Sequence, residues 1–370
     1  MNFNRMLMEK EAPAQYGYER IKYNFCESSA MVKTFTEAGI QFKPGMLLNY
    51  TDHMGNKELR TLIASEYGLE ANNVIIGTGS CMVLFIIYAT LLGPGTHAVI
   101  MHPNYMANIE IGRSLGCDLD LYSLSFENNF QIDIKRLREL IKPQTKLVSV
   151  TYPHNPTGAT IDRVTLMEIV ELCRENGSYL LLDEAYRDLT YGSALPHGAT
   201  LGQHVISTET LSKGLGIPGI RIGWVVSSDT NLVKKFLATK EQICICGSMI
   251  DEDFALQVLK NKPDLMPATR QDVINRFNIV KSFMAKQPYI EWIEPKGGVV
   301  CLPHIKNDIA LDTDTFYEIL NNKYGVFVGP GRWFEVDDRF FRLGFGAISE
   351  KKLNEGLNLI VKAVEEAANK

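Results

Sequence analysis

Residues 146–158 read KLVSVTYPHNPTG, and this stretch decides the fold class. The run at 146–151 is apolar and β-branched, which predicts a buried strand, and turn-forming and polar residues follow at once. Residues 179–186, YLLLDEAY, repeat the arrangement, with a predicted strand at 179–182 followed by acidic residues. Buried strands that end in polar residues are typical of a parallel sheet with a ligand site at one edge.

The neighbouring sequence alternates between strand and helix patterns. Such alternation predicts βαβ units, so we expect an α/β three-layer sandwich around a mostly parallel sheet. Beyond about residue 280 the pattern is that of a smaller α+β domain, which closes with a helix at 349–370 behind a serine cap. The further predicted elements are strands at 73–76, 98–101, 204–207, 222–226, 299–302, 326–328 and 340–345, and helices at 82–92 and 165–175.

We therefore predict three parts of the chain. Residues 1–45 form an N-terminal arm and part of the small domain, residues 46–280 the large domain, and residues 281–370 the C-terminal small domain. The arm has little periodicity, so we expect it to cross between domains or to a partner subunit.

Composition excludes several classes of protein. The chain has 370 residues, 45% of them hydrophobic, which is ordinary globular composition. Its net charge of −5 comes without a basic block, so nucleic acid is not an expected partner. No window is apolar enough to span a membrane, and the start does not read as a secretion signal. The seven cysteines form no CxxC pair, which predicts a reduced, cytoplasmic protein without a metal site.

Chemically useful groups follow the predicted strands. They include the amide of Asn155, the carboxylate of Asp183, the phenol of Tyr186 and the amine of Lys213, and a glycine turn lies at 77–80. Each has an ordinary alternative, because Asn155 can form a turn, Asp183 can cap a helix and Lys213 can be a solvated surface charge. Only their joint order and spacing favours a site.

Together these motifs resemble the class I and II aminotransferases, pyridoxal 5′-phosphate (PLP) enzymes of the fold type represented by aspartate aminotransferase. The resemblance runs from about residue 50 to residue 346. It implies PLP transferase fold type I and transfer of an amino group between an L-amino acid and a 2-oxo acid. The motifs are NPTG at 155–158, DEAY at 183–186, SK at 212–213 with GIRIG at 219–223, and FRLG at 341–344.

The resemblance also implies a role for each cofactor residue. Lys213 would form the Schiff base with the PLP aldehyde and later move a proton, while Asp183 would keep the pyridine nitrogen protonated. Asn155 and Tyr186 would donate to the ring 3′ oxygen, and Tyr105 would stack on the ring. The implied phosphate ligands are Gly79, Ser80, Cys81, Thr210 and Arg221.

Substrate and subunit contacts are implied in the same way. Arg342 matches the arginine that binds the substrate α-carboxylate, with Asn155 beside it. Tyr50 matches a tyrosine that reaches the phosphate of a neighbouring subunit, so the resemblance implies a homodimer with shared active sites. Glu27 lies in a stretch, 24–29, that departs from many relatives, and it either faces a cationic or polar substrate tail or is a solvated arm residue.

Two competing functions remain at this point. Residues 153–158, 210–224 and 295–298 resemble capreomycidine synthase-like members of the superfamily, which are cyclases of an arginine-derived substrate. The same cofactor residues would serve such a lyase or cyclase, because the reaction depends on which Cα bond breaks. A non-catalytic sensor is the remote alternative, and the residues before Tyr50 show no DNA-binding helix pair that would favour it.

Overall fold

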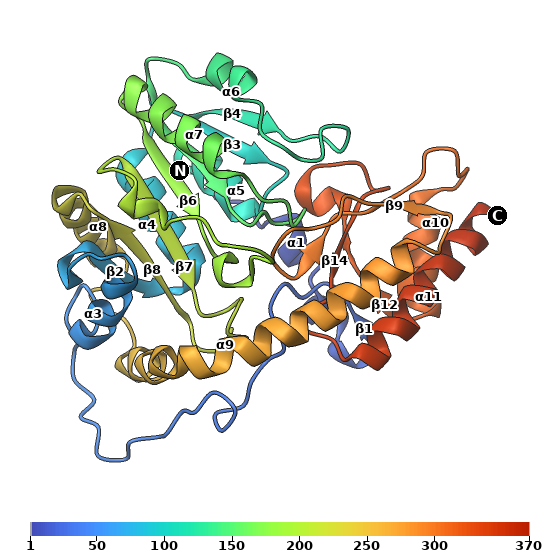
Figure 1. Cartoon of the computed structure of the whole chain (residues 1–370), viewed down its shortest axis with the longest axis horizontal. Coiled ribbons are helices and arrows are strands. Elements are labelled where there is room, and N and C mark those ends of the chain that lie inside the picture. Colours follow the sequence, from blue (N-terminus) through green and yellow to red (C-terminus); the bar gives the residue numbers. More distant parts are fainter. Residues whose placement is uncertain (1, 370) are drawn as a thin grey trace.

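The computed structural model describes residues 2–369. A large α/β part and a smaller part lie side by side, and one long helix, α9 (Met249–Met284), runs from the first to the second (Figure 1). Within residues 2–369, no helix is both long and apolar enough to cross a membrane.

A seven-stranded sheet forms the centre of the large part, in the order β2-β8-β7-β6-β5-β3-β4. All neighbouring pairs between β7 and β4 are parallel, and β8 runs antiparallel to both of its neighbours. The mostly parallel sheet is therefore confirmed. Its strands are β2 (Val74–Thr78), β3 (His97–His102), β4 (Asp118–Ser123), β5 (Thr145–Thr151), β6 (Tyr179–Asp183), β7 (Val205–Thr210) and β8 (Ile222–Ser227).

Helices cover both faces of the sheet, which makes three layers. Successive strand residues point to opposite faces, so Ile100 and Leu181 pack under the helices of one face while Val99 and Leu180 pack under those of the other. The first face carries α4 (Gly79–Leu91), α5 (Met106–Leu115) and α8 (Thr230–Ile243), and the second carries α6 (Ile134–Leu140) and α7 (Arg163–Asn176). Helix α3 (Lys57–Glu66) packs against α9 and β2.

The smaller part combines short strands with helices, as an α+β unit does. Its three-stranded sheet has the order β10-β14-β13, and two strand pairs, β1 with β12 and β9 with β11, lie beside it. Ser349 caps the last helix by accepting from the backbone N–H of Lys352, as the sequence predicts. The bounds are β1 (Tyr23–Asn24), β9 (Ile290–Glu291), β10 (Val300–Cys301), β11 (His304–Ile305), β12 (Val326–Phe327), β13 (Gly329–Pro330), β14 (Phe341–Gly344), α10 (Thr313–Glu318) and α11 (Glu350–Ala368).

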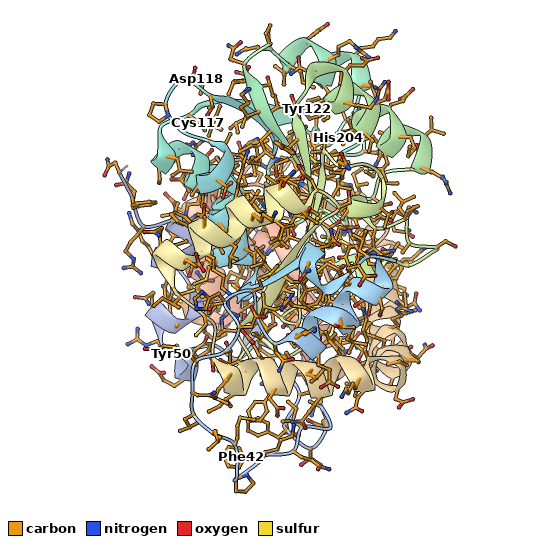
Figure 2. All side chains as sticks on the ribbon, turned by 90° about the vertical axis from the view of Figure 1, so that its left-hand side faces the viewer. Phe42, Tyr50, Cys117, Asp118, Tyr122 and His204 are labelled. Carbon is orange, nitrogen blue, oxygen red and sulfur yellow. The ribbon has the colours of Figure 1, made fainter. Side chains whose placement is uncertain are left out.

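The N-terminal arm begins with two short helices, α1 (Leu7–Lys10) and α2 (Pro13–Tyr16), and reaches the smaller part when β1 pairs with β12. Residues 41–56 then run without helix or strand around the outside of the molecule, where Figure 2 shows Phe42 and Tyr50. The division at residues 45 and 280 stays a prediction, and the second boundary falls inside α9. Single-turn segments complete the description: η1 (Tyr18–Arg20), η2 (Ala71–Asn73), η3 (Arg187–Leu189), η4 (Gly198–Thr200), η5 (Ile319–Lys323) and η6 (Gly331–Phe334).

Candidate active site

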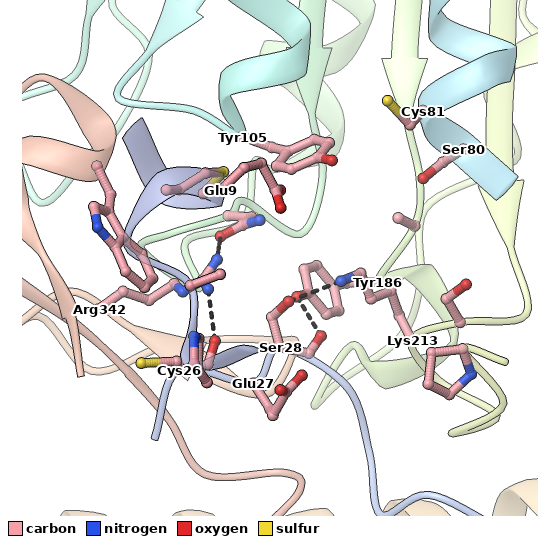
Figure 3. A pocket seen from close by; sticks show the side chains of 18 of the residues that line it. Glu9, Cys26, Glu27, Ser28, Ser80, Cys81, Tyr105, Tyr186, Lys213 and Arg342 are labelled. Atoms are coloured by element: carbon pink, nitrogen blue, oxygen red, sulfur yellow. Dashed lines mark hydrogen bonds between the residues drawn. The ribbon is translucent and has the colours of Figure 1, made fainter. Parts of the chain in front are cut away.

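A cavity of about 380 Å³ opens where the parallel strands end. The segments after β5, β6 and β7 form one side of it, the start of α4 another, and β14, η6 and the N-terminal arm close it from the smaller part (Figure 3). The lining includes Glu9, Glu27, Ser28, Ser80, Cys81, Tyr105, Asn155, Asp183, Tyr186, Ser212, Lys213, Arg221, Trp333 and Arg342.

Lys213 presents its amine to this cavity. Its Nζ donates to the Ser28 hydroxyl oxygen at 2.7 Å, and the Tyr186 hydroxyl donates to the Ser28 backbone carbonyl at 2.6 Å. Burial, together with the positive charge of Arg342, lowers the pKa of Lys213 to about 8. A sizeable fraction of this amine is therefore unprotonated near neutral pH, which is the form that attacks an aldehyde.

Asp183, at the end of β6, is a buried carboxylate held in a fixed orientation. One of its oxygens accepts from the Asn108 side-chain amide at 3.2 Å, and the other accepts from the backbone N–H of Ala185 at 3.3 Å. Burial raises the pKa of Asp183, and no cationic side chain among residues 2–369 is hydrogen-bonded to it. A protonated ring nitrogen would supply the missing positive charge.

Arg342 projects from β14 into the same cavity and is only 5% exposed. Its Nη1 donates to Asn155 Oδ1 at 3.1 Å and its Nη2 to the Cys26 carbonyl at 2.7 Å, while the guanidinium lies over the ring of Phe334. Within the described part of the chain, its Nε has no hydrogen-bond partner. A buried guanidinium with a spare N–H points to an anionic ligand such as a carboxylate.

The first turn of α4 forms a cradle suited to an anion. Gly79 has φ +72°, and a Cβ built on it would lie 2.4 Å from Arg221 Nη2, so glycine lets the guanidinium approach the helix start. Arg221 Nη1 donates to the Pro218 carbonyl at 2.9 Å and to the Ser212 hydroxyl at 3.3 Å. A helix N-terminus beside an arginine fits a phosphate group.

The structure brings most of the predicted site residues together. Ten of the thirteen line the cavity, namely Glu27, Ser80, Cys81, Tyr105, Asn155, Asp183, Tyr186, Lys213, Arg221 and Arg342.

The other three predicted residues lie outside that lining. Gly79 contributes the backbone at the start of α4, and Thr210 donates its hydroxyl to the Ile222 carbonyl at 2.9 Å behind the cavity. Tyr50 is 81% exposed on the outer segment of the arm.

Sequence reasoning missed several residues of the site. Ser28 orients both Lys213 and Tyr186, yet it lies in a stretch without periodicity. Asn108 holds Asp183, and it lies on a helix that carries other polar residues, so no local signal marks it. Ser212 lies within the lysine motif without an assigned role, and Glu9 comes from the arm, where no motif marks it.

A second polar cluster lies behind the site. One ligand atom each of Glu184, His197 and Glu209 falls within 4.8 Å of the others. Arg187 Nε donates to His197 Nδ1 at 3.0 Å, and Tyr67 donates to Glu209, so the cluster is hydrogen-bonded within the protein. That the chain binds no metal stays a prediction.

Comparison with known proteins adds the family to this geometry. The model of the family described as aminotransferase class I and II matches residues 22–360. The chain belongs to the class I and II aminotransferase family. Capreomycidine synthase of Streptomyces vinaceus is 30% identical, covering 83% of this chain and 78% of that protein. Aspartate aminotransferase of Pyrococcus horikoshii is 28% identical, covering 86% and 83%. A PLP-dependent aminotransferase structure from Streptococcus suis has a TM-score of 0.89 and 26% identity, with 99% of each chain covered.

The family settles the general chemistry of the cavity. The fold is that of the fold type I PLP enzymes, the cofactor is pyridoxal 5′-phosphate, and the chain is a PLP-dependent aminotransferase. The predicted family, fold and cofactor are thus confirmed. The residues present fit the cofactor, since the cavity offers an amine of lowered pKa, a buried carboxylate to which no cation among residues 2–369 is hydrogen-bonded, and an anion cradle.

Proposed function

We propose that Lys213 binds PLP and that this family member then moves the amino group of an L-amino acid to a 2-oxo acid. One observation carries the proposal: the amine of Lys213, with its pKa lowered to about 8, shares a cavity with the unpartnered Nε of Arg342. When bound, PLP supplies an aldehyde that bonds amines and a ring that accepts electrons from the substrate Cα. Our assignments concern what the chain's own residues do around it.

Besides Lys213, several residues are assigned to holding the cofactor. Asp183 pairs with the ring nitrogen and Tyr105 stacks on the ring face. The backbone at Gly79 and Ser80, together with Arg221, binds the phosphate. Cys81 and Ser212 line the same end of the cavity and add polar contacts there. Thr210 acts indirectly, because its hydroxyl accepts from the backbone N–H of Ser212 at 3.2 Å.

Arg342 and Lys213 are assigned to the substrate. The free Nε edge of Arg342 binds the α-carboxylate, and Asn155 keeps the guanidinium in place through its Oδ1. Lys213 Nζ removes the proton from the substrate Cα, which requires the amine to be neutral, and would deliver that proton to the aldehyde carbon of the bound cofactor. The Ser28 hydroxyl oxygen fixes the position of that amine, and the Ser28 backbone carbonyl accepts from the Tyr186 hydroxyl.

A lyase or cyclase reaction is the second candidate. It is favoured by the 30% identity to capreomycidine synthase, and the cofactor residues would be the same in both reactions. The two differ in the fate of the amino nitrogen. We expect nitrogen-15 from a labelled amino acid to appear in a new amino acid made from the added 2-oxo acid. Nitrogen-15 recovered as ammonia or in a cyclised product would contradict transamination.

We also propose a homodimer in which each site is completed by Tyr50 of the other subunit. The outer segment of the arm supports it, because Phe42, Leu47, Leu48 and Tyr50 are 70–81% exposed and large apolar side chains gather on interfaces. A reducing, cytoplasmic compartment is proposed as well, since all seven cysteines are free.

A further inference from the structure

The cavity is lined by carboxylates to which the proposed function gives no role. Its charged side chains are Glu9, Glu27, Asp183, Lys213, Arg221 and Arg342. In the proposed function, on which this inference rests, Lys213, Arg221 and Asp183 serve the cofactor and Arg342 serves the α-carboxylate. Glu9 and Glu27 are the two carboxylates left without an opposite charge.

Among residues 2–369, neither carboxylate forms an ion pair, and both residues are exposed. Glu27 Oε1 accepts one long contact of 3.5 Å from the Asn24 amide. The Glu9 side chain has no hydrogen-bond or ion-pair partner among residues 2–369. Glu11, two residues further on, provides a contrast, because it accepts from both Arg332 and Trp333. That contact holds the arm beside the cavity and leaves Glu9 free.

Both carboxylates act on the site itself. Burial raises the pKa of the Cys81 thiol, and the charge of Glu9 adds to the increase. Glu27 opposes the lowering of the Lys213 pKa that burial and Arg342 cause. Figure 3 shows Glu9 above and Glu27 below Arg342, and all three residues line the same cavity.

A second observation points to a ligand in this cavity. The Arg342 guanidinium is 5% exposed, lines this cavity and has an unpartnered Nε, which points to an incoming carboxylate. The apolar wall of the cavity includes Met8, Ala12 and Pro13 of the arm and Trp333 of η6. An apolar wall and carboxylates in one cavity match an aliphatic stem that ends in a cation.

We propose that Glu9 and Glu27 select an amino acid whose linear side chain ends in an ammonium or a guanidinium. The α-carboxylate binds Arg342, the methylenes lie along the apolar wall, and the terminal cation lies near the two glutamates. A second carboxylate on the substrate would meet like charges, so acidic amino acids should be poor substrates.

The test measures amino-acid binding and turnover on the holoenzyme. Arginine, ornithine, norleucine and glutamate are titrated without 2-oxo acid while the cofactor absorbance is followed, and kcat/KM is then measured with 2-oxo acid. We expect half-saturation by arginine or ornithine at a concentration at least about 10-fold below that for norleucine, and glutamate weakest.

Variants identify the residues responsible. Glu9→Gln and Glu27→Gln should each weaken binding of the cationic amino acids by about 5- to 10-fold, and the double variant should weaken it by about 50-fold. Binding of norleucine should change by less than about 2-fold. Glu19→Gln is the matched control, because Glu19 is an exposed arm residue outside the cavity, and it should change nothing.

Each other outcome has a definite meaning. If norleucine binds wild type as well as arginine does, or if Glu19→Gln has the same effect as the cavity variants, the selection by charge is wrong while transamination stands. If the glutamate variants bind cationic and neutral amino acids more weakly by the same factor, the glutamates have no selective role. If no amino acid changes the absorbance of wild type, the proposed function itself fails.

Discussion

Arg342 shows how one side chain can fix the orientation of a substrate. Two of its nitrogens are held by Asn155 and Cys26, and among residues 2–369 the buried Nε has no hydrogen-bond partner. Arg342→Lys keeps the charge but loses the planar fork, so we expect kcat/KM to fall by about 10- to 100-fold. Steady-state kinetics checks this, with Arg339→Lys as a control because Arg339 binds carbonyls outside the cavity. Undiminished turnover in Arg342→Lys would refute the carboxylate assignment.

The lowered pKa of Lys213 predicts how the reactivity of its amine depends on pH. Its pKa is lowered to about 8, first by burial and then by Arg342. The neutral amine is the reactive form, so in the apoprotein its reaction with trinitrobenzenesulfonate should rise with pH and reach half its maximum near pH 8. An ordinary lysine reaches that point near pH 10.4. Arg342→Gln removes a lowering charge and should move the midpoint upward. Peptide mapping of the labelled lysine measures both, and an ordinary midpoint for Lys213 would contradict the mechanism.

At the scale of elements, the start of α4 makes the anion cradle. Gly79→Ala places a Cβ against Arg221 in a backbone conformation with φ +72° that side chains rarely adopt. We expect the apoprotein to lose about 1 kcal/mol of stability and PLP affinity to fall at least about 10-fold. Gly93→Ala, beyond the other end of α4 and with open space around it, should change neither. Urea unfolding measures the stability and cofactor titration measures the PLP affinity. Unchanged PLP affinity in Gly79→Ala would contradict the assignment of the start of α4 to the phosphate.

The elements also show which parts of the fold can be predicted from sequence. The central residues of β5 and β6, 147–150 and 180–182, are buried and mostly apolar because helices cover both faces, so their pattern is clear. Strand β4 lies at the sheet edge and is only half-buried, and its mixture of aspartate and leucine gave no such run. Helix α9 was missed because Pro263 and Pro267 lie inside its 36 residues, whereas proline normally ends a helix.

The site residues also divide into those that can be predicted from sequence and those that cannot. Asn155, Asp183 and Lys213 follow buried strands, so the sheet itself brings them together and their order in sequence suffices. Ser28 and Glu9 reach the cavity from the arm, and Asn108 from one turn inside a helix. Their positions depend on how the two parts pack, which no local periodicity encodes.

At the scale of the whole molecule, we expect two chains to share each site. Tyr50 is exposed and remote from the cavity of its own chain, so we expect it to complete the site of a partner. Mixing Tyr50→Phe chains with Lys213→Ala chains should create heterodimers in which one site has both groups, and activity should return to a fraction of wild type. Size-exclusion chromatography with activity assays of the mixture checks this. A fully active monomer, or no recovery in proven heterodimers, would contradict shared sites.

The most direct test of the central claim is to find which residue carries the cofactor. The purified holoenzyme should be yellow, and borohydride reduction followed by peptide mapping should place the cofactor mass on Lys213, the lysine beside Ser28 in the cavity. Lys213→Ala should bind no cofactor covalently while its circular dichroism stays that of wild type. Cofactor found on any other lysine would contradict the account.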